Sequence, residues 1–267
     1  MRRQRIVALA LCALAPLLLT AAPARAEGAE FDVVGLKLGM TLAETRAILH
    51  DGGYDADPKR VAEHRLHYNY SDGVHNNLQT DDFVFYIDAG KDTGEGVKKR
   101  EDSFSLYFSP PPEEQRLVSI SRYYENQLTP PTSDEYHAAL IEKYGPPDED
   151  TKVRMVWYFP AGKVNCVVGG FSPGSKKDIV YSVFQPAPGG GFADQMRNPK
   201  AKSLDDCASY LVYSLNGIGQ APASNVTASM VDVQNWARST LESYDWVDEL
   251  QKKATEARLG KGSKPKL

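Results

Sequence analysis

The stretch from Val33 to Tyr54 constrains the fold more than any other part of the chain, because it has the pattern of a strand, a turn, a helix and a stop. Thr41 can cap a helix through its hydroxyl, and Glu44 can bond back to the N–H of Thr41, which makes a reciprocal capping box. Gly52 or Gly53 then provides a left-handed stop. The apolar stripe of this predicted helix consists of Leu42, Ile48 and Leu49. None of these features requires a catalytic group.

The first 26 residues have the pattern of a secretory signal peptide. Three arginines precede an apolar run from Ile6 to Leu19, and Ala24-Arg25-Ala26 provides a small-x-small cleavage site. We therefore expect a mature chain that begins at Glu27 and is periplasmic or secreted. A retained N-terminal anchor is the alternative, but the apolar run is shorter than the roughly 20 residues of a membrane helix. We expect no transmembrane segment in the mature chain.

The net charge of the mature chain indicates which classes of partner it can bind. Removal of residues 1–26 takes away four arginines and no acid, so the formal charge changes from −4 to −8. Contacts with phosphates supply much of the affinity of proteins for nucleic acids, and an acidic protein repels phosphates. We therefore expect no nucleic-acid partner.

Beyond the first helix the apolar period changes from helical to two, which predicts strands. Phe83, Phe85 and Ile87 alternate, so we place all three on the face that packs against the helix. The acidic loop 88–96 is interpreted as a hairpin tip and not as a calcium site, because strands and not helices flank it. The predicted strands of this half are residues 62–70, 80–89, 103–109 and 115–124.

The same order recurs in the second half of the chain. Ser133 is the predicted N-cap of a second helix, and Gly145-Pro146-Pro147 ends that helix. Period-two alternation then predicts strands at residues 152–159, 163–171 and 178–185.

Two windows carry a resemblance to a known family. Gly35-Leu36-Lys37-Leu38-Gly39-Met40-Thr41 before the first helix, and Lys143-Tyr144-Gly145-Pro146-Pro147 running towards Trp157-Tyr158-Phe159, resemble the repeats of the beta-lactamase-inhibitory-protein-like superfamily, which includes small outer-membrane-assembly lipoproteins. The resemblance implies a mostly non-enzymatic protein that binds other proteins across a sheet. The chain lacks the lipidation cysteine of the lipoprotein branch at its cleavage site, so the resemblance does not imply a lipid anchor.

These patterns together predict an α+β fold of two tandem helix-plus-antiparallel-sheet units, followed by a C-terminal hairpin and a long helix. The hairpin strands are predicted at 208–215 and 226–233, and the helix near Gln234. The basic residues after it indicate a solvated tail, with contact to an anionic surface as the alternative. The predicted boundaries are 1–26 for the signal peptide, 27–129 and 130–186 for the two units, 187–250 for the C-terminal strands and helix, and 251–267 for a disordered basic tail.

Two cysteines remain after the predicted cleavage, Cys166 and Cys207. In an oxidising compartment this even count favours one structural disulfide. A catalytic thiol is the alternative and would need a histidine base, but no nucleophile motif accompanies any histidine. We predict a Cys166–Cys207 disulfide.

His64, His67, Asp72 and His75 form the one set of residues with metal-ligand chemistry. Side chains three apart on a strand point to opposite faces, so we interpret the set as a polar strand and turn. The sequence contains no nucleophile elbow, glycine-rich phosphate loop or spaced Cys/His quartet. We therefore predict no catalytic residue, no metal and no cofactor.

The candidate binding residues are tyrosines on predicted strands. If Phe83, Phe85 and Ile87 face the helix, the pleat turns Tyr86 outward, and the same parity applies to the other strands. Tyrosines on an open sheet face supply interface anchors, whereas tyrosines under a loop or the C-terminal helix are core residues. The predicted binding residues are Tyr86, Tyr107, Tyr123 and Tyr158.

The functional prediction is a secreted, periplasmic, non-catalytic binding protein that recognises a macromolecular partner, a protein or another component of the cell envelope, through an open sheet face. The alternatives are a periplasmic hydrolase without a recognisable local motif and an envelope scaffold protein.

Overall fold

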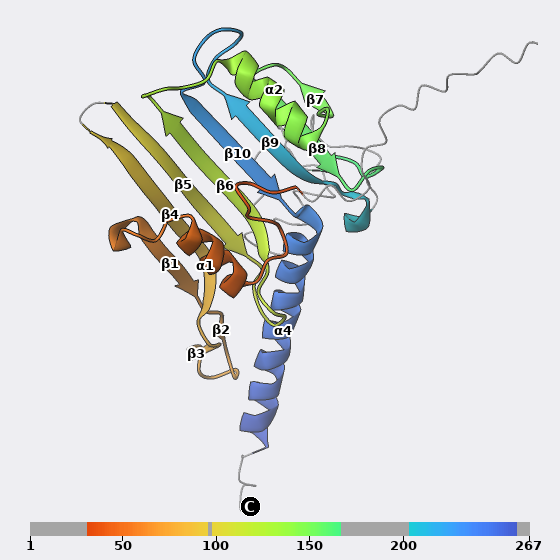
Figure 1. The fold of residues 1–267 in the computed structure, drawn as a ribbon. Coiled ribbons are helices and arrows are strands. Elements are labelled where there is room, and N and C mark those ends of the chain that lie inside the picture. The colour runs from red at the N-terminus through yellow and green to blue at the C-terminus, as the bar shows by residue number, and fades with distance from the viewer. Residues whose placement is uncertain (1–30, 96–97, 167–202, 261–267) are drawn as a thin grey trace, which may run out of the picture.

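A computed structural model describes residues 31–95, 98–166 and 203–260, and within these ranges the fold is α+β (Figure 1). One antiparallel sheet of eight strands forms its centre. In the order in which they pair, the strands are β1 (Val61–Leu66), β4 (Phe83–Glu95), β5 (Lys98–Phe108), β6 (Leu117–Asn126), β10 (Asn225–Val231), β9 (Ser209–Leu215), β8 (Arg154–Phe159) and β7 (Glu149–Asp150). A small hairpin of β2 (Asn69–Tyr70) and β3 (Leu78–Gln79) lies apart from this sheet.

Helix α1 (Leu42–Asp51) begins as the sequence predicts. The Glu44 N–H donates to the Thr41 hydroxyl at 3.2 Å, and the Thr41 N–H donates to the Glu44 carboxylate at 2.8 Å. The capping box is therefore confirmed, and the helix ends at Gly52.

Helix α2 (Ser133–Tyr144) begins one residue earlier than predicted. Its N-cap is Thr132 and not Ser133. The Thr132 hydroxyl accepts from the Glu135 N–H at 3.2 Å, and Glu135 bonds back to the Thr132 N–H at 2.8 Å. Ser133 lies inside the helix and donates its hydroxyl to the Ala221 carbonyl at 3.1 Å. The position of Glu135, three residues after Thr132, decides between two adjacent hydroxyl residues.

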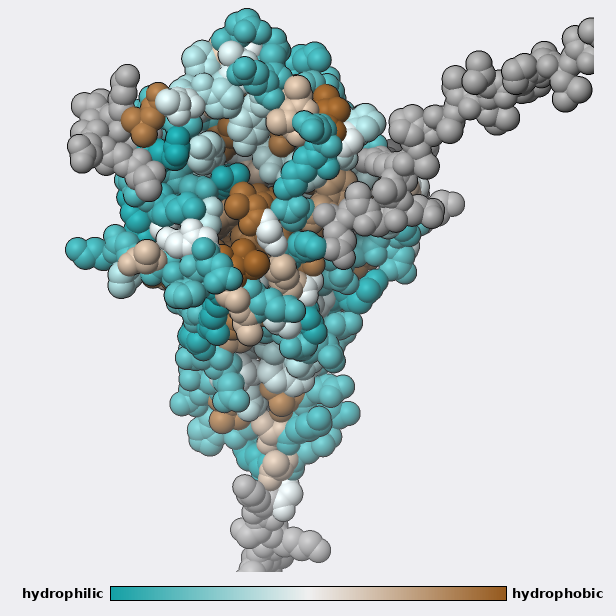
Figure 2. All heavy atoms as spheres, in the orientation of Figure 1, coloured by the Kyte–Doolittle hydropathy of each residue, from teal (hydrophilic) through white to brown (hydrophobic). Residues whose placement is uncertain are grey.

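Both α1 and α2 pack on one side of the sheet, which we call the helix face (Figure 1). Its core contains Leu49 and Leu140 from the helices and Ile87, Leu106, Ile120 and Trp157 from the strands. Figure 2, in the same orientation, shows apolar residues near the centre of this face with hydrophilic residues around them. Partly buried apolar residues that pack against this core are Phe31, Leu38, Met40, Leu42, Ile48, Val61, Tyr124, Tyr136 and Phe159.

The prediction that Phe85 faces the helix is wrong, because β4 contains a bulge. Across β1 and β4, His64 pairs with Tyr86 but Arg65 pairs with Val84, so Phe85 is an extra residue. Val84 is buried in the helix-face core, whereas the Phe85 ring lies against Tyr107, with ring centroids 5.7 Å apart. The bulge also shifts the alternation for the residues before it. Phe83 is not part of the helix-face core and packs against Tyr68, with ring centroids 5.3 Å apart, so the predicted direction holds for Ile87 alone.

The opposite side of the sheet, which we call the open face, is covered in part by helix α4 (Val233–Leu259) and by the disulfide. Trp236 of α4 and both cysteines pack there with Val231 and Tyr210. The predicted disulfide is confirmed: Cys166 and Cys207 are bonded, with their Cα atoms 5.3 Å apart.

The predicted disordered tail is wrong for residues 251–259, because α4 continues to Leu259 and extends beyond the sheet beside the β2–β3 hairpin (Figure 1). The Arg258 guanidinium donates to the Asp72 carbonyl at 2.8 Å, which secures the last turn. Tyr68 and Tyr244 make a second contact, with ring centroids 6.3 Å apart. No helix in the described ranges is long and apolar enough to cross a membrane.

The C-terminal hairpin is confirmed as β9 and β10, and it joins the central sheet between β6 and β8. The signal peptide, the predicted strand 178–185, most of the strand 163–171, and residues 187–202 lie outside the described residues. The boundaries predicted between the units stay predictions.

Candidate functional site

The four predicted tyrosines lie on one face of the sheet, because directly opposed residues of neighbouring strands share a face. Tyr86 opposes Tyr107, and Tyr107 in turn opposes Ser119 of β6. Tyr123 lies four residues after Ser119 on the same strand, so its side chain points to the same face. The same row continues through Val231 and Tyr210 to Tyr158. All four tyrosines are half-buried and belong to the open face.

Tyr86 and Tyr107 form the centre of an aromatic row. His64 stacks on Tyr86 at 4.0 Å, Tyr86 stacks on Tyr107 at 5.1 Å, and Trp236 of α4 lies 5.5 Å from Tyr107, all measured between ring centroids. Burial raises the pKa of the Tyr107 hydroxyl. Helix α4 therefore covers one end of the row, and Tyr107 is partly a packing residue.

The Tyr158 hydroxyl already makes two hydrogen bonds within the protein. Its hydroxyl donates to the Glu149 carboxylate at 2.6 Å and accepts from the Asn165 amide at 2.9 Å. Burial, together with the neighbouring carboxylate, raises the pKa of Tyr158 far above its ordinary value. The structure thus places Tyr86 and Tyr107 together and Tyr158 at the far end of the row, among the residues that pack around the disulfide.

Tyr123 lies beside a group of small hydroxyl residues that the sequence analysis did not identify. They occupy the open face of four adjacent strands, where strands lie ~4.8 Å apart. Ser105 opposes Ser121, which opposes Ser229, while Tyr123 opposes Ser103 on one side and Thr227 on the other. We define the hydroxyl cluster as Ser103, Ser105, Ser121, Ser214, Thr227 and Ser229.

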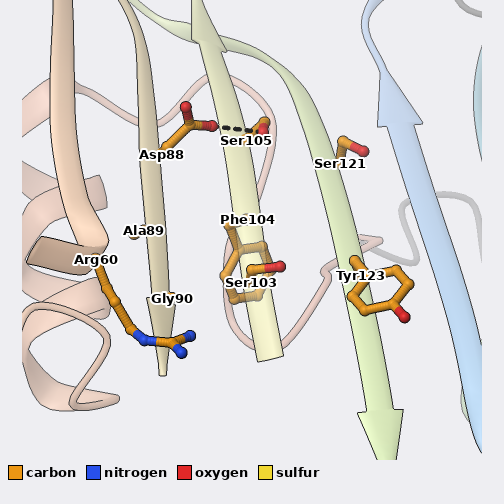
Figure 3. Close-up of a pocket in the computed structure, with 9 residues that line it drawn as sticks. All are labelled: Arg60, Asp88, Ala89, Gly90, Ser103, Phe104, Ser105, Ser121 and Tyr123. Atoms are coloured by element: carbon orange, nitrogen blue, oxygen red, sulfur yellow. Dashed lines mark hydrogen bonds between the residues drawn. The ribbon is translucent and has the colours of Figure 1, made fainter. Parts of the chain in front are cut away.

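A shallow hollow of about 300 Å³ lies at the β4 end of the hydroxyl cluster (Figure 3). Gly90 contributes no side chain there, and a Cβ at Gly90 would lie 3.3 Å from the Ser103 Cβ. Figure 3 shows Asp88 and Arg60 on one side of the hollow and Tyr123 on the other. The Ser105 hydroxyl donates to Asp88 at 2.6 Å, and Arg60 donates to Asp92 at 3.0 Å. The hollow therefore combines a carboxylate, a guanidinium, hydroxyls and one aromatic ring.

No protein-family model matches the chain, and neither a curated protein nor a solved structure matches it. The resemblance to the beta-lactamase-inhibitory-protein-like superfamily therefore stays a prediction. The chemistry of the open face and of the buried groups is the basis for assigning a function.

The five histidines do not converge on one site. Each lies within 3.3 Å of a different aspartate, and the pairs are spread over several elements. The described residues contain no group of three or more His, Cys, Asp or Glu side chains that could hold a metal ion. The pairs are His50–Asp55, His64–Asp88, His67–Asp82, His75–Asp72 and His137–Asp150.

The most strongly perturbed group of titratable residues lies on the helix face. Asp102, 6% exposed, accepts two hydrogen bonds from Arg122 and one from Tyr54 at 2.7 Å. Burial, and hydrogen bonding to Asp102, raise the pKa of Tyr54, while burial raises the pKa of Tyr136 to about 12. Since Asp102, Arg122 and Tyr54 satisfy one another's hydrogen bonds within the core, they have the character of a structural network.

Proposed function

We propose that this chain is a secreted, periplasmic binding protein that recognises a macromolecular partner through the open face of its sheet and performs no catalysis. The observation that carries the proposal is the cross-strand register, which puts Tyr86, Tyr107, Tyr123 and Tyr158 on the same face. Half-buried tyrosines offer large contact areas at a low cost in side-chain entropy.

The distribution of ionisable groups supports binding over catalysis. A catalytic site brings groups with perturbed pKa values together in a cleft. In the described residues the histidine–aspartate pairs are scattered. Tyr54 and Tyr136, whose pKa values are raised, lie near a buried ion pair on the other side of the sheet, whereas Tyr107 and Tyr158 belong to the open face, so these groups do not share one cleft. The disulfide supports an oxidising compartment, where such bonds persist.

We further infer that the two halves of the sheet are tandem units. Among the described residues, each unit would be a capped helix followed by four strands of the central sheet, and the last strands, β6 and β10, pair at the centre. The second unit would thus include the hairpin of β9 and β10, which the sequence analysis placed after the units. The Met40 carbonyl accepts from the N–H of Leu117, the first residue of β6, and the Pro131 carbonyl accepts from the N–H of Ala223, two residues before β10, both at 2.8 Å. Equivalent contacts at equivalent places favour two copies of one structural plan.

Site-specific photocrosslinking in the periplasm tests the proposed function. A photoreactive phenylalanine analogue replaces Thr227 or Ser121, which are exposed on the open face, or Glu142, an exposed control on α2. We expect discrete crosslinked species from the first two positions and none from Glu142. Crosslinks from Glu142 alone, or no crosslink from any position, would contradict the proposal.

A further inference from the structure

We propose that the hydroxyl cluster and the hollow beside Gly90 bind a strand of neutral oligosaccharide. This proposal rests on the proposed function and gives the chemical class of its ligand. The inference begins with unused hydrogen-bonding groups. Within the part of the chain that the structure describes, the hydroxyls of Ser103, Ser121, Ser214, Thr227 and Ser229 make no hydrogen bond, and Ser121 and Thr227 are exposed.

A hydroxyl group donates one hydrogen bond and accepts others, so a field of hydroxyls matches a ligand that itself carries many hydroxyls. Sugars are such ligands. Serine and threonine side chains are short, so ordering them on a rigid sheet costs little conformational entropy. Because the strands fix their spacing, the cluster is organised before a ligand arrives.

The hollow adds groups that fix an orientation. Asp88 accepts from Ser105 at 2.6 Å and lies 3.3 Å from His64, so its carboxylate is held in place by two neighbours. Arg60 is held by Asp92 at 3.0 Å. The Tyr123 ring lines the hollow from the opposite side (Figure 3) and offers an apolar surface to the carbon-bound hydrogens of a sugar ring.

The open face disfavours other ligand classes. Asp92, Glu101 and Glu125 oppose one another across β4, β5 and β6 on this face, beside the hydroxyl cluster, and they would repel an anionic polymer. Protein interfaces contain an apolar core. The rows of the hydroxyl cluster on β5, β6 and β10 are instead polar. Apolar residues border them at Val212, opposite Ser229, and at Val231, two positions further along β10.

Nuclear magnetic resonance titration of the purified protein tests the proposal. The probes are cellohexaose, maltohexaose and chitohexaose, with a sulfated hexasaccharide as the anionic control. We expect at least one neutral probe to shift the amide signals of residues 103–105, 121–123 and 227–229, and the sulfated probe not to do so. The absence of such shifts with all three neutral probes at millimolar concentration would overturn the proposal, as would stronger shifts with the sulfated probe.

The double variant Ser121→Ala/Thr227→Val removes two free hydroxyls with little change of shape. We expect about tenfold weaker binding of the active probe. The control Asn77→Ala, at an exposed position in the β2–β3 hairpin, should bind like the parent. Equal affinity of the double variant and the control would overturn the proposal. Photocrosslinks from Thr227 to a protein, without sugar binding, would refute the sugar ligand and leave the proposed function standing.

Discussion

Arg122 of β6 donates two hydrogen bonds to Asp102 of β5, at 2.7 and 2.9 Å, within the core of the helix face. Tyr54, which follows α1, donates a third to the same carboxylate. The Arg122 guanidinium also lies 4.9 Å from the centre of the Tyr124 ring. The ion pair thus ties the end of the first helix to the middle of the sheet.

Removal of one partner from this pair should be strongly destabilising. Asp102→Ala leaves the Arg122 charge buried and unpaired, which typically costs about 3–5 kcal/mol of unfolding free energy. Arg154→Ala, the control, breaks an exposed pair with Glu149 and should cost less than about 1 kcal/mol. Urea denaturation measures both values. Similar losses in the two variants would show that the buried pair is not a structural network.

The caps of α1 and α2 should contribute equally if the two halves are tandem units. Thr41→Ala and Thr132→Ala each remove a hydroxyl that caps a helix, and each should lower the unfolding free energy by about 1 kcal/mol. Glu142→Gln on the exposed side of α2 is the control, with an effect near zero. Thermal or chemical denaturation provides the comparison, and a cost at only one of the two caps would argue against equivalence.

Local features of the fold were predictable from the sequence. The capping box of Thr41 and Glu44 depends on residues three apart and needs no knowledge of the rest of the chain. The Cys166–Cys207 pairing followed because two cysteines allow one pairing. The outward direction of Tyr86 was also predicted correctly, although the parity argument used Phe85, which lies at a bulge.

Features that depend on pairing between distant segments were not predictable. The bulge at Phe85 exists only relative to β1. The helical state of residues 251–259 depends in part on the contact of Arg258 with Asp72, 186 residues away. The hydroxyl cluster shows as alternating serines in single strands, such as Ser103 and Ser105, but its extent depends on the register of β5, β6 and β10.

Alkaline pH should destabilise the protein through two tyrosines of the helix face, Tyr136 and Tyr144. Burial raises the pKa of Tyr136 and of Tyr144 from 10.0 to about 12 in the folded state. The folded state therefore keeps these protons where the unfolded state loses them, so the stability is complete below about pH 10 and decreases as pH rises towards 12. Denaturation at a series of pH values measures the slope. Tyr136→Phe should make the dependence of unfolding free energy on pH less steep. An unchanged slope in that variant would show that Tyr136 does not cause the loss of stability.

Loss of the disulfide should lower stability without altering the sheet. Cys166 and Cys207 close a loop with a sequence separation of 41, which corresponds to about 4 kcal/mol in the chain-entropy model. Cys166→Ala/Cys207→Ala should lose an amount of this order in urea denaturation while its circular dichroism spectrum stays the same. Two reactive thiols in the unfolded, unreduced parent would show that the bond does not form.

Substitutions at two tyrosines of the open face should distinguish a binding anchor, Tyr86, from a packing residue, Tyr158. Tyr158→Ser loses hydrogen bonds with Glu149 and Asn165 and leaves a cavity beside the disulfide, so it should cost roughly 3 kcal/mol. Tyr86→Ser, near the sheet edge and in contact with His64 and Tyr107, should cost clearly less.

Tyr86→Ser should nevertheless weaken partner crosslinking from Thr227, because it removes an aromatic ring from the face that is proposed to bind. Tyr158→Phe keeps the ring and should leave crosslinking close to that of the parent. Melting temperature and crosslinking yield, measured on the same variants, distinguish the two roles. If Tyr86→Ser unfolds the protein as readily as Tyr158→Ser does, while the remaining folded protein crosslinks normally, Tyr86 is a packing residue and the partner binds elsewhere.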